Sequence, residues 1–199
     1  MNENTIKEAL KKGERVTLEC KKAVAEVPKS LWETYSAFAN TIGGLILLGV
    51  DEHRKETDLA KRYEIVGVKD AQKILADFWN TINSDKVNAN VLADSDVEVV
   101  NMDGKQIVCI RVPMAAWRAK PIYINGNVYK GTYRRNHEGD YHCTERQVRA
   151  MCEKATALRD ICAAARLGLL AFRAKRVRLI HLKIGYLLPT FTATLDFLG

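Results

Sequence analysis

The fold is decided by one stretch of the chain, residues 33–51, which reads Glu33-Thr-Tyr-Ser-Ala-Phe-Ala-Asn-Thr-Ile-Gly-Gly-Leu-Ile-Leu-Leu-Gly-Val-Asp51. The first half has the pattern of an amphipathic helix, which Gly43-Gly44 is expected to end. Residues 45–50 are continuously apolar, as is typical of a central strand covered on both faces. The stretch therefore predicts a helix, a turn and a buried strand that ends at a carboxylate, Asp51.

A helix, a strand and a helix start are expected before this stretch. Asn4 is expected to cap a short helix that runs through Lys12, because its side chain accepts hydrogen bonds from free N–H groups. Residues 15–22 alternate between apolar and polar, which predicts a half-buried strand. Ser30, with Glu33 three residues later, has the pattern of a capping box and predicts the start of the next helix.

Local patterns also place the elements that follow Asp51. The charged residues 52–63 are expected to form a loop. Four further patterns predict two helix starts and two hairpin turns, namely the helix cap Asp70, the turns Asp103-Gly104 and Asn125-Gly126, and the capping box of Thr144 with Gln147. The chain is therefore expected to contain helices interleaved with short strands.

The net charge of +7 is distributed unevenly over the 199 residues. Residues 1–152 hold 23 Lys and Arg against 21 Asp and Glu, a net charge of +2, whereas residues 153–199 hold 8 against 3, a net charge of +5. The basic character alone therefore does not indicate nucleic-acid binding. We predict one domain over residues 1–152, followed by a basic apolar tail that is the stub of a further domain or an aberrant C-terminus.

Cysteine usage and hydropathy favour a reducing compartment and no membrane span. The five cysteines are an odd number without tight spacing, and the polar N-terminus lacks the apolar core of a signal peptide. No uncharged stretch reaches the ~18 apolar residues that a transmembrane helix needs. A cytoplasmic protein is therefore expected. Four residues without the spacing of a zinc site are expected to be structural or to lie at the surface, namely His137, His142, Cys143 and Cys152.

Three carboxylates, Glu14, Glu19 and Asp51, are candidate ligands of Mg²⁺ or Mn²⁺ that would activate water for phosphodiester cleavage. Residues five apart on an extended strand point to opposite faces, so Glu14 joins Glu19 only if it lies on a bend before the strand. The alternative is that Glu14 is solvated near a helix end and that Glu19 pairs with Lys21 or Arg15. A catalytic role for Lys21 would be to stabilise phosphate charge.

A second cluster combines basic and aromatic side chains. Arginine and lysine contact phosphates and tyrosine stacks on bases, so this combination favours nucleic-acid binding. The candidate residues flank the Asn125-Gly126 turn and are Arg118, Lys120, Lys130, Tyr133, Arg134 and Arg135. The alternative is a solvated loop whose tyrosine packs inward.

The order of these residues resembles the Schlafen AlbA-like domain over about residues 3–152. The resemblance rests on Gly13-Glu14-x₄-Glu19, on the run Ser36-Ala-Phe-Ala-Asn40-Thr-x-Gly43-Gly, and on Asp51. The second half of the family pattern is matched by Pro121-x-Tyr123, Tyr129-x₃-Tyr133-Arg134-Arg135 and Thr144-x₂-Gln147. The resemblance implies an α/β (α+β) fold with a mixed sheet and flanking helices.

The same resemblance implies two kinds of activity. Bacterial members are described as nucleic-acid-binding regulators of transcription, which makes DNA or RNA the expected partner. Vertebrate Schlafen proteins include metal-dependent endoribonucleases with three acidic residues, and Glu14, Glu19 and Asp51 match those positions. Those enzymes enclose RNA between two lobes, so an active form of this chain would be a homodimer. Cys20 departs from the usual aromatic, and a protein-interaction module is a third alternative.

Overall fold

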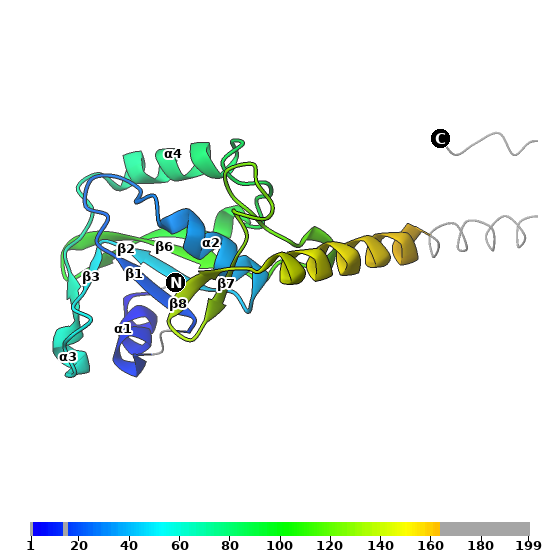
Figure 1. Cartoon of the computed structure of the whole chain (residues 1–199). Coiled ribbons are helices and arrows are strands. Elements are labelled where there is room, and N and C mark those ends of the chain that lie inside the picture. Colours follow the sequence, from blue (N-terminus) through cyan, green and yellow to red (C-terminus); the bar gives the residue numbers. More distant parts are fainter. Residues whose placement is uncertain (1, 14–15, 164–199) are drawn as a thin grey trace, which may run out of the picture. The chain divides into compact units, whose positions relative to one another are not determined.

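The computed structural model describes residues 2–13 and 16–163, and the chain divides into two units, Met1–Ala155 and Thr156–Gly199. The first unit is an α+β domain in which helices cover both faces of a mixed β-sheet (Figure 1). The predicted fold class is therefore confirmed. Among the described residues, no helix is both long and apolar enough to cross a membrane.

The main sheet has four strands in the order β1-β2-β6-β5. β1 and β2 are parallel, whereas β2 with β6 and β6 with β5 are antiparallel. The strands are β1 (Leu18–Lys21), β2 (Gly44–Leu48), β5 (Val97–Met102) and β6 (Lys105–Val112). The apolar stretch after Gly43 thus forms a central strand, as predicted, but this strand ends at Leu48 instead of Val50, and Asp51 lies within β3 (Val50–Glu52).

Two short antiparallel pairs and the helices complete the first unit. The pairs are β3 (Val50–Glu52) with β4 (Tyr63–Ile65), and β7 (Tyr133–Asn136) with β8 (Gly139–His142). The helices are α1 (Glu3–Lys12), α2 (Leu31–Asn40), α3 (Leu59–Arg62) and α4 (Ala71–Ile82). Short 3₁₀ turns lie at η1 (Asp94–Asp96) and η2 (Trp117–Ala119), and residues 145–163 are helical.

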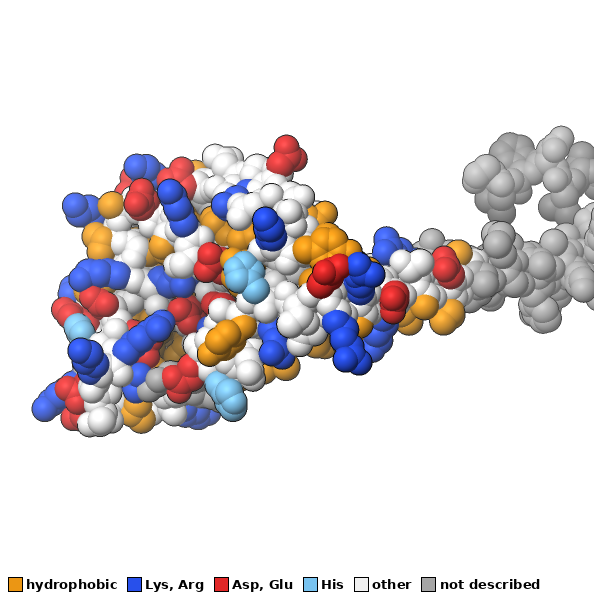
Figure 2. Space-filling view, viewed as in Figure 1, with side chains coloured by type: hydrophobic (Ala, Val, Ile, Leu, Met, Phe, Trp, Pro, Cys, Tyr) orange, Lys and Arg blue, Asp and Glu red, His pale blue; other side chains and the backbone are white. Residues whose placement is uncertain are grey.

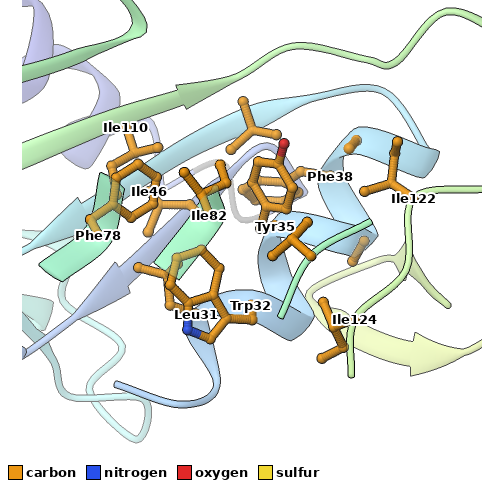
Figure 3. Close-up of a cluster of buried hydrophobic side chains, with 14 of the residues drawn as sticks. Leu31, Trp32, Tyr35, Phe38, Ile46, Phe78, Ile82, Ile110, Ile122 and Ile124 are labelled. Atoms are coloured by element: carbon orange, nitrogen blue, oxygen red, sulfur yellow. The ribbon is translucent and has the colours of Figure 1, made fainter. Parts of the chain in front are cut away.

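The sheet separates two hydrophobic cores. The larger core packs α2 and α4 against one face of β2 and β6, and the smaller core packs α1 against the other face. In the larger core the rings of Trp32 and Phe78 stack with centroids 5.4 Å apart, and Tyr35 and Phe38 are fully buried (Figure 3). The apolar side chains of the predicted helix therefore fix it onto the central strand.

The polar side chains of α2 hold the second half of the domain. The Asn40 amide donates to the carbonyl oxygens of Ile122 at 2.7 Å and Tyr133 at 3.0 Å, and it accepts from the Ile122 N–H at 2.8 Å. The Ser36 hydroxyl donates to the Ile122 oxygen at 2.8 Å and accepts from the Tyr133 N–H at 3.0 Å. Buried backbone groups need such partners, so these two residues of α2 place the chain that leads into β7.

Several local predictions are confirmed. The Asp70 carboxylate accepts from the Lys73 N–H at 2.9 Å and caps α4. Asp103-Gly104 forms the turn between β5 and β6, with positive φ at both residues. The predicted capping box is present, because the Thr144 N–H donates to the Gln147 side chain and the Gln147 N–H donates back to the Thr144 hydroxyl.

Other predictions are wrong in their detail. Asn2, rather than Asn4, caps α1, and Ser30 makes no capping hydrogen bond through its side chain. The predicted strand over residues 15–22 is formed only by Leu18–Lys21 among the described residues. Residues 52–63 include parts of β3 and β4 and all of α3 instead of a continuous loop. The turn at Asn125-Gly126 is not flanked by regular strands, since only isolated bridges occur there.

Candidate functional site

A buried network of charged side chains lies beside the edge strand β1. Glu19 is only 8% exposed, and its carboxylate accepts from the Arg135 guanidinium at 3.0 Å and from the Lys21 ammonium at 3.2 Å. Arg54 approaches the same carboxylate at 3.7 Å. Lys21 also donates to the Ser30 hydroxyl at 3.3 Å. Because a buried carboxylate is costly without partners, these cations offset the cost of burying Glu19 inside the domain.

Arg135 joins three parts of the fold. Besides Glu19, its guanidinium donates to the Asp140 carboxylate at 2.9 Å and to the Leu18 carbonyl oxygen at 3.2 Å. It also lies over the Phe38 ring, 5.0 Å from the centroid. Asp140 in turn accepts from the Thr34 hydroxyl at 2.7 Å. Arg135 therefore ties the β7–β8 hairpin to β1 and to α2.

A cavity of about 40 Å³ opens beside this network. Its lining combines carboxylates, guanidinium groups and a thiol, and consists of Leu18, Glu19, Cys20, Glu52, Arg54, Tyr63, Arg135 and Glu138. Glu52 lies 3.0 Å from the Arg62 guanidinium and 3.6 Å from that of Arg54. Burial raises the pKa of the Cys20 thiol, and the negative charges of Glu52 and Glu19 raise it further. This thiol is therefore not a reactive nucleophile at neutral pH.

Of the three predicted carboxylates, Glu19 is the one that the structure places in the lining of this cavity. Asp51 does not line the cavity and pairs with Lys22 at 2.8 Å. That hydrogen bond is the main reason why the pKa of Asp51 is lowered. Glu14 lies outside the described residues.

Glu52, which the sequence reasoning missed, faces the cavity instead of Asp51. Neighbouring residues on a strand point to opposite faces. The alternation along this strand therefore could have indicated Glu52 as a candidate beside Asp51. Within residues 2–13 and 16–163, no three His, Cys, Asp or Glu side chains form a group suited to a metal ion. In this arrangement the Arg135 guanidinium and the Lys21 ammonium hold the Glu19 oxygens.

The six residues predicted to bind nucleic acid fall into two groups. Lys120, Tyr133 and Arg135 are buried, whereas Arg118 and Lys130 are exposed and Arg134 is half-buried. Lys120 donates to the Asn40 carbonyl oxygen at 2.6 Å, and burial lowers its pKa. The Lys120 ammonium therefore provides a hydrogen-bond partner for the carbonyl group of the last residue of α2.

Tyr133 makes internal contacts as well. Its ring centroid lies 4.2 Å from that of His142. Burial raises the pKa of Tyr133, and the charge of Glu33 raises it further. Together with the burial of Lys120 and Arg135, this geometry means that half of the predicted set holds the domain together.

Two exposed aromatic rings lie beside cations of the helix that begins at residue 145. The Lys154 ammonium lies 3.7 Å from the centroid of the Trp117 ring. Tyr129 is 47% exposed and interacts with Arg149, whose pKa is raised mainly by its hydrogen bond to Glu145 and further by Tyr129. We define the basic–aromatic surface as these four residues and two exposed neighbours, namely Trp117, Arg118, Tyr129, Lys130, Arg149 and Lys154. Blue, red and orange side chains lie close together near the start of this helix in Figure 2.

The fold and the buried network define an α+β domain in which Arg135 of the β7–β8 hairpin binds to the edge strand β1 of a mixed sheet. The model of the family described as Schlafen, AlbA_2 matches residues 14–144. Because this match covers more than half of the sequence, the chain belongs to the Schlafen AlbA_2 family. The predicted family resemblance is therefore confirmed. No curated protein matches the chain significantly.

Two solved structures resemble the chain. The N-terminal domain of a RecG-related protein from Nitrosomonas europaea is 26% identical, covers 72% of this chain and 94% of its own, and superposes with a TM-score of 0.51. A protein from Corynebacterium diphtheriae is 16% identical, covers 68% of this chain and 23% of its own, and has a TM-score of 0.43. The first of these is similar over nearly its whole length.

Proposed function

We propose that this chain binds nucleic acid, DNA or RNA, through the basic–aromatic surface. The observation that carries the proposal is the placement of two exposed aromatic rings, Trp117 and Tyr129, beside the cations Lys154 and Arg149 of one helix. Cations that contact phosphates and rings that stack on bases are the two components of sequence-tolerant binding.

The comparisons support the same class of function. The Nitrosomonas europaea neighbour has a name that relates it to the ATP-dependent DNA helicase RecG. The Schlafen AlbA_2 family includes members described as regulators, and we extend the proposal to a regulatory role in transcription. The nearly neutral charge of residues 1–152 requires a local surface, because an even distribution of charge gives no electrostatic attraction to phosphates.

The test compares charge-reversed variants in the full chain. Fluorescence anisotropy with labelled DNA and RNA oligonucleotides is measured between about 50 and 200 mM salt, where binding through phosphates weakens steeply. We expect Arg118→Glu with Lys130→Glu to weaken binding at least tenfold. The double variant should also lower the salt slope by roughly one for each phosphate that it no longer binds.

The matched control is Lys55→Glu with Lys73→Glu, which changes the net charge equally at exposed positions on other elements. Equal nucleic-acid affinities of the two double variants would contradict the proposal for this surface. Binding of the wild-type chain that does not depend on salt would rule out phosphate recognition altogether. The basic residues after position 153 are the same in every variant, so they do not affect the comparison.

The second candidate is the metal-dependent endoribonuclease that uses Glu14, Glu19 and Asp51 as ligands and Lys21 to stabilise phosphate charge. The observation in its favour is that three carboxylates, Glu19, Glu52 and Glu138, line one cavity. Structured RNA is incubated with Mn²⁺ and with wild type, Glu19→Gln or Asp77→Asn, the last a control on α4. Cleavage that is absent from wild type, or equal in all three, rejects this candidate.

A further inference from the structure

The open edge of the main sheet, strand β5, has features that the nucleic-acid proposal does not use. β5 pairs only with β6, so its other edge has no strand partner among the described residues. Natural proteins protect such edges with charged side chains, above all lysine, with proline or with bulges. β5 reads Val-Glu-Val-Val-Asn-Met, has no lysine, proline or bulge, and carries Glu98 as its single charged residue. By contrast, the other edge strand, β1, includes Lys21 and its Leu18 carbonyl accepts from Arg135.

The register of the hairpin determines which backbone groups point outward. A two-residue turn is closed by a hydrogen-bonded pair, here Met102 and Lys105, and hydrogen-bonded pairs alternate along an antiparallel ladder. The N–H and C=O groups of Met102, Val100 and Glu98 therefore face β6. Those of Asn101, Val99 and Val97 face the open edge. The Val97 N–H is already donated to the Asp94 carbonyl oxygen of the preceding turn.

We propose that two copies of this chain pair antiparallel through β5, with the twofold axis at Val100, and form a continuous eight-stranded sheet. This register pairs Val99 of one copy with Asn101 of the other. All four outward N–H and C=O groups of Val99 and Asn101 then find partners, which gives four hydrogen bonds across the axis. A register centred on Val99 is worse, because Asn101 would then need the Val97 N–H that the turn already uses.

The side chains are also compatible with this pairing. Val100 lies opposite Val100 of the second copy, and Glu98 lies opposite its Met102, so no like charges face each other. Val99 is half-buried and Asn101 is exposed, so neither residue is fully enclosed by the domain. A second copy is the favoured occupant because β5 is complementary to itself in length, hydrogen-bonding groups and charge. A single six-residue pairing is small, so the dimer is expected to depend on protein concentration.

Proline provides a sharp test, because it removes an N–H and is tolerated on an edge strand only where that N–H faces outward. In the full chain, Asn101→Pro and Val99→Pro are each expected to shift the monomer–dimer equilibrium at least tenfold towards monomer in sedimentation velocity. Asn101→Ala and Val99→Thr keep the N–H and are the matched controls, which should remain dimeric. Circular dichroism verifies that the variants are folded.

Amide hydrogen exchange of the wild-type chain gives a second readout that needs no substitution. Exchange at Val99 and Asn101 should slow as protein concentration rises, while the helix α4 should be unaffected. A chain that is monomeric at all concentrations, with unchanged exchange at these amides, overturns the proposal. A dimer that both folded proline variants leave intact, or whose formation protects another surface instead, overturns it equally. If both proline variants unfold, the exchange measurement alone decides.

Discussion

At the scale of single residues, Arg135 is the side chain on which most of the buried charge depends. Its side chain is 1% exposed and pairs with Glu19 and Asp140. Arg135→Met should destabilise the domain by about 3–5 kcal/mol, because removing one partner of a buried ion pair leaves the other charge unpaired. Urea unfolding followed by circular dichroism measures this loss.

The control for Arg135→Met is the double variant with Glu19→Gln. The double variant should be less destabilised than the sum of the two single-variant losses predicts, since Glu19→Gln removes one of the charges that Arg135→Met leaves unpaired. A loss below about 1 kcal/mol for Arg135→Met would show that the ion pairs contribute no more than surface pairs do.

Asn40 connects α2 to the chain before β7 through three backbone groups of Ile122 and Tyr133. Asn40→Ala removes this partner from the Ile122 N–H and the Tyr133 carbonyl oxygen, whereas the Ile122 oxygen keeps the Ser36 hydroxyl. Each buried group left unsatisfied costs about 1–3 kcal/mol. We expect the free energy of unfolding, measured with urea, to fall by about 3 kcal/mol or more. Asn80→Ala, at an exposed position of α4, is the control and should be neutral. Equal effects of the two substitutions would contradict this role of Asn40.

Asp51 gives a pH dependence of known sign. Its pKa is lowered, first by the hydrogen bond from Lys22, so the native state favours the charged carboxylate. The resulting stability is present above the unfolded-state pKa of about 3.9 and is lost as the pH falls through the native pKa. Asp51→Asn should therefore cost a few tenths of a kcal/mol at pH 7 and progressively less as the pH falls through the native pKa. A cost that is larger in acid than at pH 7 would contradict the sign.

At the level of single residues, the sequence predicts which side chains belong to the site better than it predicts which of them contact one another. The pattern singles out Glu19, and the alternative pairing of Glu19 with Lys21 is present in the structure. Burial of Lys120 and Arg135 does not follow from the sequence, because a basic residue in a charged segment normally remains in water. Their partners, Asn40 and Glu19, lie far away in the sequence. Only the tertiary fold reveals such pairs.

At the scale of elements, the turn between α2 and β2 depends on close packing at Gly44. A Cβ atom built there would lie 2.5 Å from the ring of Phe38, and the φ of this glycine is not in the left-handed region. Gly44→Ala should therefore cost about 1–3 kcal/mol through overpacking alone. Thermal unfolding measures this cost. Adding Phe38→Leu should recover part of it, which would not occur if backbone strain were the cause.

Local patterns predict those elements that local interactions build. The β5–β6 hairpin and the capped start of α4 are predicted correctly, because turn and cap residues are adjacent in the sequence. The apolar stretch after Gly44 predicts one strand through Val50, but Gly49 separates β2 from β3. Gly49 has a φ of 93° and packs against the backbone of Gly67. That contact between distant segments is invisible in the local pattern.

At the scale of the whole molecule, the first unit ends inside a helix. The helical residues 145–163 cross the boundary after Ala155, three residues beyond the predicted boundary at 152. Val148 and Ala155 are fully buried in the first unit, and Lys154 lies over the Trp117 ring. These contacts indicate that the helix up to residue 155 belongs to the core of the domain.

A chain that stops after residue 155 should therefore keep the stability of the domain. Its urea midpoint should match that of the full chain, because every buried side chain of the first unit is retained. A chain that stops after residue 143 loses Val148 and Ala155, and burial of a valine alone contributes about 1.5–3 kcal/mol. The shorter chain should unfold at a clearly lower urea concentration. Equal urea midpoints of the two truncated chains would contradict this conclusion, because residues 144–155 would then contribute nothing to the stability of the domain.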